Sequence, residues 1–303
     1  MKDNAVIVRA GKNSKHPMWV ADRNADFDLL VVAYEDIPQD VASCGNQYVL
    51  IPGGKVAGWY KLFVNHPDIL KQYRYVALLD DDIECDALSL NTSFDLGKKF
   101  NLMVWQPSLS AESYFSYAIT VSNPCFVIRY VNFVEMMCPF FNTFFLREIV
   151  PLFSAGCESG VDRLWSVCCP NLRRSCAIID AISVHHRRPV GENRAAQGFV
   201  GAYATYEDFL SEFHKVTGVE QRQPMTFSGI TKGHRLLSGR FFVCLLSLAP
   251  LLSFHRLNGP RPIRKFASLT KANCRNQPLQ QMDIKELVPS VKRLSKRLIG
   301  ATI

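Results

Sequence analysis

The sequence has few of the features that mark secreted or disulfide-bonded proteins. Its ten cysteines include no CxxC pair and form no recognisable disulfide framework. Only four apolar residues, Ala5 to Val8, follow the polar start, which is too short for the apolar core of a signal peptide. Scattered cysteines in a chain of 303 residues without such a peptide are expected to be buried thiols in a reducing compartment. The sequence therefore predicts a cytoplasmic protein.

Long apolar runs are also missing. The most apolar stretch, Phe241 to Phe254, has fourteen residues and is interrupted by Pro250, whereas a membrane-spanning helix needs about 20 residues. Basic residues flank this stretch, among them Arg235 and Arg256. The combination predicts a segment that lies on the anionic inner face of a membrane without crossing it. The alternative is a buried C-terminal helix followed by a solvated tail.

Acidic residues are scarce near the C-terminus. From His255 onward the chain has eleven Lys and Arg but only Asp283 and Glu286 as acids, whereas residues 1–254 carry a net charge of −1. The formal charge of +8 therefore belongs to the tail. Because the body is not basic and the tail has no interleaved aromatic residues, the sequence predicts no nucleic-acid partner.

What the sequence does contain is a buried strand that ends in three acids. Tyr75 to Leu79 is a continuous apolar run, typical of a strand covered on both faces, and Asp80, Asp81 and Asp82 follow at once. Adjacent carboxylates repel one another unless a cation lies among them, and their hard oxygens suit Mg²⁺ or Mn²⁺. Ligands of open α/β sheets bind beyond the carboxyl ends of the strands. The triad thus predicts a site for a metal and a diphosphate, and the alternative is a solvated acidic turn.

Other apolar runs alternate with helical segments along the chain. Strands are expected at 5–8, 27–34, 102–105 and 177–184. Helices are expected at 56–73, with a break at Pro67, and at 85–99. This alternation predicts an α/β fold. The aromatic-rich stretch 107–146 is expected to belong mainly to the core.

Two polar turns lie where such a fold would meet a nucleotide. The turn after the first strand contains Arg9, Gly11 and Ser14, and Lys55 ends a second, glycine-bearing turn. We treat these four residues as candidates for binding a nucleotide donor.

Two further positions carry candidate reactive groups. His185 or His186, at the end of the last predicted strand, can supply a metal ligand through a neutral imidazole. Asp162 follows a glycine-bearing loop at a predicted helix start and suits a base, and Glu158 competes with it for that role. The alternatives are a surface turn for the histidines and a helix cap for the acids.

These residues lie within motifs that resemble a known family. The chain is similar to the family called domain of unknown function 707, whose bacterial and plant members are loosely regarded as glycosyltransferases. The resemblance is carried, in chain order, by Val8 to Ser14 with His16-Pro17 and Trp19, Phe27 to Leu29, Tyr75 to Ile83, Gln106 to Ser110, Arg129 to Glu135, Gly160 to Trp165, Ile179 to Ala181 and His186 to Gly191. It covers about residues 5–195 and leaves the last hundred residues unmatched.

The resemblance implies a GT-A-like nucleotide-diphosphosugar transferase fold, with a Rossmann-like mixed sheet flanked by helices. It implies that Asp80 and Asp82 hold the metal together with His186, that Asp80 and Asp81 face the donor, and that Asp162 is the acid on the acceptor side. One departure concerns the loop before Asp162. A Ser-Gly-Trp-Gly-like loop is expected there, but this chain has Cys157-Glu158-Ser159-Gly160, so Glu158 stays a second catalytic candidate.

Taken together, the motifs and the resemblance predict a metal-dependent glycosyltransferase. It would move a sugar from a nucleotide-diphosphate donor to a glycan or lipid-linked acceptor in surface polysaccharide synthesis, with inversion. Residues 1–230 would form the catalytic domain, with the nucleotide-sugar part at about 1–105 and the acceptor part at about 106–195. Residues 231–303 would form a membrane-associating region. The alternatives are a nucleotidyltransferase acting on sugar phosphates and a catalytically inactive membrane-associated scaffold.

Overall fold

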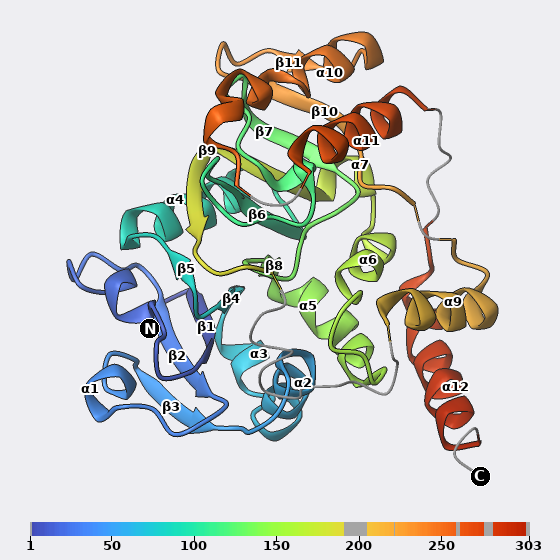
Figure 1. The fold of residues 1–303 in the computed structure, drawn as a ribbon. Coiled ribbons are helices and arrows are strands. Elements are labelled where there is room, and N and C mark those ends of the chain that lie inside the picture. The colour runs from blue at the N-terminus through green and yellow to red at the C-terminus, as the bar shows by residue number, and fades with distance from the viewer. Residues whose placement is uncertain (1, 191–204, 221, 259–260, 276–280, 301–303) are drawn as a thin grey trace.

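The computed structural model describes residues 2–190, 205–220, 222–258, 261–275 and 281–300. Gly191, the last residue of the family-like motifs, lies outside these ranges. The described residues form a large mixed sheet with helices packed around it (Figure 1). The predicted α/β class, a mixed sheet flanked by helices, is therefore confirmed.

The sheet has a parallel half and a mixed half. The strands are β1 (Asn4–Ala10), β2 (Asp28–Ala33), β3 (Gln47–Leu50), β4 (Tyr75–Asp80), β5 (Ile83–Glu84), β6 (Val104–Leu109), β7 (Phe126–Val131), β8 (Phe140–Asn142), β9 (Cys176–His186), β10 (Thr226–Thr231) and β11 (Leu236–Leu237). Their order is β11-β10-β7-β9-β6-β8-β4-β1-β2-β3, and β5 pairs with the end of β9. Strands β4, β1, β2 and β3 are parallel neighbours, as are β6 and β9, whereas the short β8 lies antiparallel between β4 and β6.

The helices connect and cover these strands. The α-helices are α1 (Gln39–Ala42), α2 (Lys55–Asn65), α3 (Ile69–Gln72), α4 (Ala87–Lys99), α5 (Thr143–Ile149), α6 (Asp162–Trp165), α7 (Leu172–Ser175), α9 (Tyr206–Thr217), α10 (Arg240–Leu246), α11 (Pro262–Cys274) and α12 (Leu287–Gly300). The 3-10 helices are η1 (His16–Trp19), η2 (Ala118–Thr120), η3 (Val150–Ser154), η4 (Ser166–Cys168), η5 (Ala249–Arg256) and η6 (Ile284–Glu286). Helices α9 and α12 lie side by side (Figure 1).

The sequence patterns account for most of these boundaries. All seven residues of β1 are buried, as expected for a parallel strand covered on both faces. The expected break at Pro67 is confirmed, because α2 ends at Asn65 and α3 begins at Ile69. The aromatic-rich stretch is mainly core, since Phe133 and Phe141 are buried, although Phe144 is exposed. The ten cysteines are free, and most of them are buried.

The C-terminal elements continue the sheet. Strand β10 pairs antiparallel with β7, so the predicted division between residues 230 and 231 falls within a strand. Helix α11 packs against the sheet region through Phe266, whose ring lies 6.5 Å from that of Phe115. The division into a catalytic domain and a C-terminal region stays a prediction. In the described part of the chain, no helix combines the length and the apolar character needed to cross a membrane.

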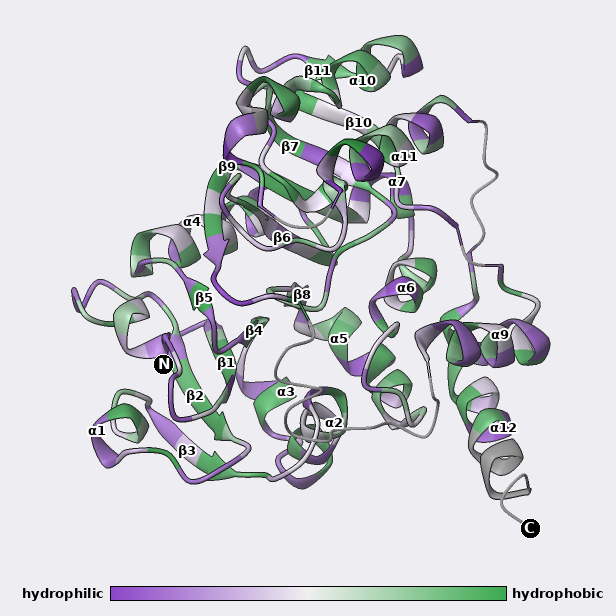
Figure 2. Ribbon diagram, viewed as in Figure 1, coloured by the Kyte–Doolittle hydropathy of each residue, from purple (hydrophilic) through white to green (hydrophobic). Residues whose placement is uncertain are grey.

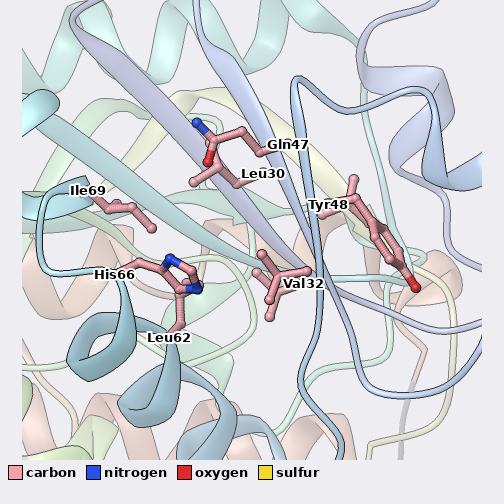
Figure 3. A pocket seen from close by; sticks show the side chains of 9 residues that line it. Leu30, Val32, Gln47, Tyr48, Leu62, His66 and Ile69 are labelled. Atoms are coloured by element: carbon pink, nitrogen blue, oxygen red, sulfur yellow. The ribbon is translucent and has the colours of Figure 1, made fainter.

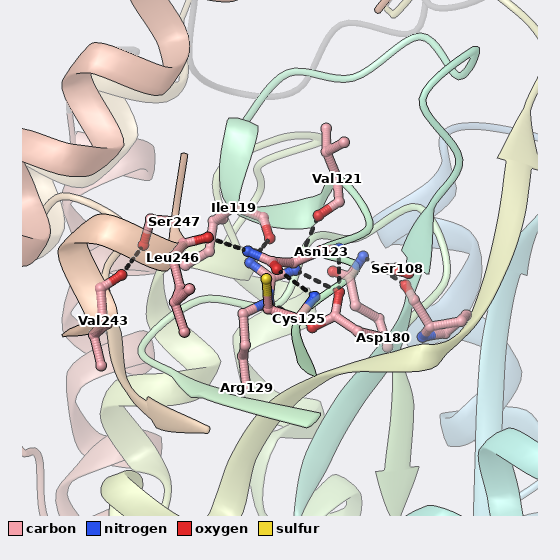
Figure 4. A network of polar contacts seen from close by, with 12 residues as sticks. Ser108, Ile119, Val121, Asn123, Cys125, Arg129, Asp180, Val243, Leu246 and Ser247 are labelled. Carbon is pink, nitrogen blue, oxygen red and sulfur yellow. Dashed lines mark hydrogen bonds and ion pairs between the residues drawn. The ribbon is translucent and has the colours of Figure 1, made fainter. Parts of the chain in front are cut away.

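A buried polar network fastens this end of the molecule (Figure 4). The Arg129 guanidinium donates to both carboxylate oxygens of Asp180, at 2.6 and 2.8 Å, and also to two main-chain carbonyls. The main-chain N–H of Asn123 donates to the same carboxylate at 2.8 Å. The side-chain nitrogen of Asn123 donates to the carbonyl of Leu246 in α10, also at 2.8 Å. The network therefore ties α10 to the central strands β7 and β9.

Candidate functional site

The acidic triad lies at the point where the strand order reverses. From β1 the chain moves outward to β2 and β3 and then returns to β4 on the other side of β1. Ligands of α/β sheets bind in the crevice beyond the carboxyl ends of the strands at such a point. Arg9 of β1 lies opposite Asp80 of β4 in the register, so the residues that follow them meet beyond the ends of these strands.

Asp81 links the ends of three strands. One carboxylate oxygen accepts hydrogen bonds from the Gly11 N–H and the Tyr34 hydroxyl, both at 2.9 Å. A Cβ at position 11 would lie 2.1 Å from the Tyr34 hydroxyl oxygen, so a larger residue there would displace Tyr34 from Asp81. Burial raises the pKa of Asp81, and the pairing of its other oxygen with Arg188 opposes the rise. Asp81 thus holds the ends of β1, β2 and β4 together.

Asp80, Asp82 and His186 form a candidate metal centre. One ligand atom from each residue lies within 4.8 Å of the other two. A register shift in β9 opposite Pro107 and Ser108 bends that long strand, and its end pairs with β5 directly after the triad. This bend is what brings His186 to Asp82. His185, the other histidine considered as a metal ligand, hydrogen-bonds Ser110 at 3.0 Å and is not part of the group.

The hydrogen bonds of His186 test whether a cation suits this group. Its Nδ1 lies 2.9 Å from the Tyr114 carbonyl oxygen, which only accepts, so Nδ1 carries the proton. In the neutral ring Nε2 then presents a lone pair, 3.3 Å from an oxygen of Asp82. A cation or a second proton between these two acceptors would stabilise the contact, and burial lowers the pKa of His186. The other oxygen of Asp82 is buried without a hydrogen-bond partner. The donor set therefore fits a hard divalent cation.

Two basic side chains share the carboxylates. Lys55 Nζ donates to both oxygens of Asp80, at 2.8 and 2.7 Å, and Arg188 Nε donates to Asp82 at 3.0 Å. Burial is the main reason that the pKa of Asp80 is raised to about 7; Lys55 opposes the rise and Asp82 adds to it. Burial disfavours the charge of Arg188, but Asp81 and Asp82 together raise its pKa. Lys55 and Arg188 also suit the phosphates of a bound nucleotide.

A second pair of acids lies next to this cluster. The Asp162 carboxylate, at the start of α6, accepts from the main-chain N–H of Met136, whose carbonyl oxygen accepts from Lys55 at 3.1 Å. Burial raises the pKa of Asp162. Glu135 is buried as well, and one of its carboxylate oxygens has no partner. Burial, followed by the charge of Asp162, raises the pKa of Glu135 to about 8.

Glu135 and Arg188 are not among the site residues predicted from the sequence, although both lie in family-like motifs. A signal for Glu135 was present, because it is a lone acid in the otherwise apolar or neutral stretch from Phe133 to Phe141. Burying a carboxyl group costs free energy unless it is paired, so a lone acid in an apolar stretch is typical of a functional site. The proximity of Arg188 to the triad depends on the bend in β9, which the sequence pattern did not reveal.

Arg9 and Ser14, two further residues predicted to bind the donor, bond to loops near the cluster. Arg9 donates to the carbonyl oxygens of Ile51 and Gly53, at 2.9 and 2.8 Å, and so fixes the loop that leads into α2. Burial lowers the pKa of Arg9 to about 10. Ser14 hydrogen-bonds His16 at 2.7 Å within the turn after β1. The donor-binding roles of Arg9 and Ser14 stay predictions.

Glu158 lies at the N-terminus of α2. Its two carboxylate oxygens accept from the main-chain N–H groups of Val56 and Ala57, at 2.9 and 3.1 Å. Because Lys55 is the first residue of α2, this cap and the Arg9 contacts together hold Lys55 against Asp80. The catalytic role of Glu158 stays a prediction.

A separate cavity of about 340 Å³ lies away from these acids (Figure 3). It lies between β2, β3 and the C-terminal end of α2, and extends to α3. Its lining residues are Leu30, Val31, Val32, Gln47, Tyr48, Val49, Leu62, His66 and Ile69. None of the candidate site residues lines it, so it is distinct from the acidic cluster at the strand ends.

Comparisons with known proteins give a partial family match. The family described as "Protein of unknown function (DUF707)" matches residues 48–130, which is less than half of the chain and includes the acidic triad. No curated protein matches the sequence.

Solved structures show a distant likeness. Residues 1–349 of Staphylococcus aureus TarS in complex with UDP-GlcNAc are 14% identical, with a TM-score of 0.45, covering 71% of this chain and 65% of that one. A second structure of the same TarS fragment is 13% identical, with a TM-score of 0.40 and coverages of 61% and 59%. Protein A197 from STIV is 13% identical, with a TM-score of 0.37 and coverages of 78% and 94%. The chain thus spans less than two thirds of the TarS fragment, and the likeness is one of chain path alone.

Proposed function

We propose that the protein is a metal-dependent glycosyltransferase that moves a sugar from a nucleotide-diphosphate donor to a glycan or lipid-linked acceptor, with surface polysaccharide synthesis as its setting. The observation that carries the proposal is the meeting of His186 Nε2 with Asp80 and Asp82 at the reversal point of the sheet. The family-like motifs and the match over residues 48–130 support it.

The residues divide into a donor side and an acceptor side. Asp80, Asp82 and His186 would hold Mn²⁺ or Mg²⁺, which supplies Lewis-acid neutralisation of the leaving diphosphate when bound. Lys55 and Arg188 lie beside these carboxylates and would pair with the phosphates once the donor enters.

The acceptor side would be served by Asp162. Its carboxylate would take the proton of the acceptor hydroxyl while that oxygen attacks the anomeric carbon, so that a single displacement inverts the configuration. Burial raises the pKa of Asp162, which makes it a stronger proton acceptor. The charge of Asp162 in turn contributes to the raised pKa of Glu135, which lies beside it.

The test is nucleotide-sugar binding with and without metal. Calorimetry with UDP-, GDP- and CDP-sugars should show binding that requires Mn²⁺ or Mg²⁺, and His186→Gln should weaken metal binding by roughly tenfold or more. His185→Gln is the matched control and should leave the affinity unchanged, because its ring is bonded to Ser110. Binding of the wild type to no nucleotide sugar in the presence of metal would exclude the proposal.

Product analysis separates the alternatives. A transferase releases a nucleoside diphosphate, whereas a nucleotidyltransferase releases pyrophosphate. Asp162→Asn should lower the transfer rate by about 10²–10⁴ while donor affinity stays unchanged, since the amide keeps the shape and cannot accept the proton. Metal-dependent donor binding without any product would favour the inactive scaffold.

A further inference from the structure

Helix α10 exposes its apolar side to solvent. Phe241 and Phe242 are 73% and 55% exposed, Leu245 is 56% exposed, and Leu248 follows just beyond the helix at 36%. These four residues, the α10 apolar face, are spaced so that they lie on one side of the helix. Large apolar side chains grouped on a surface are typical of a site that a membrane or another protein covers.

The opposite side of α10 is anchored to the protein. Val243, Cys244 and Ser247 are buried. The Ser247 hydroxyl accepts from the Asn273 side chain of α11 at 2.6 Å. Asn123 donates to the Leu246 carbonyl at 2.8 Å, as Figure 4 shows. The helix therefore cannot turn its phenylalanines inward without breaking buried hydrogen bonds.

The chain on either side of this face is basic. Between Glu220 and Asp283 the sequence has no acidic residue, and its Lys and Arg there are Arg222, Lys232, Arg235, Arg240, Arg256, Arg261, Arg264, Lys265, Lys271 and Arg275. Lys232, Arg235 and Arg256 are exposed, on both sides of α10 along the chain. Figure 2 shows α10 as a mostly hydrophobic ribbon at one end of the sheet, beside β10 and β11.

We propose that the α10 apolar face inserts into the interfacial region of an anionic lipid surface. The phenylalanines and leucines would enter the boundary between headgroups and acyl chains, while the surrounding arginines and lysines pair with lipid phosphates. With seven residues α10 is about 10 Å long, so it would lie in the surface. A second copy of the chain fits less well, because a symmetric contact would bring the same basic residues together.

The experiment measures binding of the full-length protein to lipid vesicles. At low salt we expect cosedimentation with vesicles containing about 30% phosphatidylglycerol in phosphatidylcholine, at least tenfold tighter than with pure phosphatidylcholine. Added salt should weaken this binding, because it screens the charges. The inference does not depend on the proposed catalytic activity.

Matched variants test the two contributions separately. Phe241→Ser with Leu245→Ser should abolish binding, whereas Phe144→Ser with Leu88→Ser, at sites 68% and 67% exposed on other elements, should not. Arg235→Glu with Arg256→Glu should weaken binding to anionic vesicles, and Lys61→Glu with Lys99→Glu should have a smaller effect.

Because all these side chains are exposed, each variant should keep the melting temperature of the wild type. Equal binding to anionic and neutral vesicles, or wild-type binding by the Phe241→Ser and Leu245→Ser variant, would overturn the proposal. A dimer in solution that the same variant dissociates, without any vesicle binding, would assign the face to a second copy instead.

Discussion

At the scale of single residues, acids outnumber the Lys and Arg side chains that pair with them within the described part of the site. Asp80, Asp81 and Asp82 are accompanied by Asp162 and Glu135, and Lys55 and Arg188 form ion pairs with the triad. Carboxyl groups with little access to water must share charge with a cation or keep a proton. Burial raises the pKa of four of the five acids, which favours proton uptake by them when no cation is bound.

Glu135 gives a prediction about stability and pH. Its pKa is raised from 4.5 to about 8 by burial and by Asp162, so the folded state binds more protons than the unfolded state between these values. The stability that this group contributes is complete below about pH 4.5 and is lost as the pH rises through 8. Glu135→Gln cannot titrate, so it does not lose stability in this way. Its free energy of unfolding, relative to that of the wild type, should therefore rise by about 3 kcal/mol from pH 5 to pH 7.5.

The measurement is chemical denaturation of both proteins across this pH range. Glu148→Gln, at an exposed position, is the matched control for the Glu-to-Gln change itself. A difference for Glu135→Gln that stays constant across this pH range would show that Glu135 titrates alike in the folded and unfolded states.

At the scale of elements, the site depends on where α2 begins. Glu158 caps the first turn of α2, and the loop before it is held by Arg9, so Lys55 emerges at a fixed point beside Asp80. Gly54 permits this approach, since a Cβ there would lie 2.2 Å from the Glu158 carboxylate. The end of β9 is fixed in a similar way by its pairing with β5.

Substitutions at Glu158 separate a capping role from a catalytic one. Glu158→Ala should lower the free energy of unfolding by about 1 kcal/mol, because two helix N–H groups lose their acceptor. Glu158→Gln keeps an oxygen for one of them and should lose less. If Glu158 acts only as a cap, Glu158→Gln should also keep most of the transfer rate while Asp162→Asn does not. A rate loss in Glu158→Gln as large as that of Asp162→Asn would make Glu158 the base.

At the scale of the whole molecule, the central strands and the C-terminal elements form one packed unit. Phe266 of α11 packs on Phe115, and Leu287, Val291 and Leu294 at the start of α12 are buried. The Arg129–Asp180 pair lies beneath this junction and orders the segment that bonds to α10. The C-terminal part therefore supports the fold in addition to carrying the proposed lipid-binding face.

Breaking the buried pair should be costly. The side chains of Arg129 and Asp180 are 3% and 0% exposed, so Asp180→Ala leaves a guanidinium buried without its partner and should cost about 3–5 kcal/mol of unfolding free energy. Asp68→Ala breaks the exposed pair with Lys71 and should cost less than about 1 kcal/mol. Thermal or denaturant unfolding of both variants gives the comparison. Equal losses would mean that the buried pair contributes no more than a surface one.

The sequence by itself determined the local elements and the position of the acids. The apolar run Tyr75 to Leu79 needed only its own composition to predict β4, and its three aspartates had to follow at the strand end. The break at Pro67 was equally local, because a missing N–H and a steric clash act within one turn. Asp80, Asp82 and His186 were named together from the sequence and the family resemblance, and the structure brings them together.

The tertiary structure alone decided what depends on distant contacts. The insertion of β8 between β4 and β6, the bend in β9 and the meeting of Glu135 with Asp162 join residues far apart in the chain. Likewise, the apolar segment 241–254 could be read as buried or as surface. Only the burial of Val243 and Ser247 showed which side of α10 faces outward. Whether a side chain is buried or paired depends on its neighbours in the folded chain, and the local sequence does not specify those neighbours.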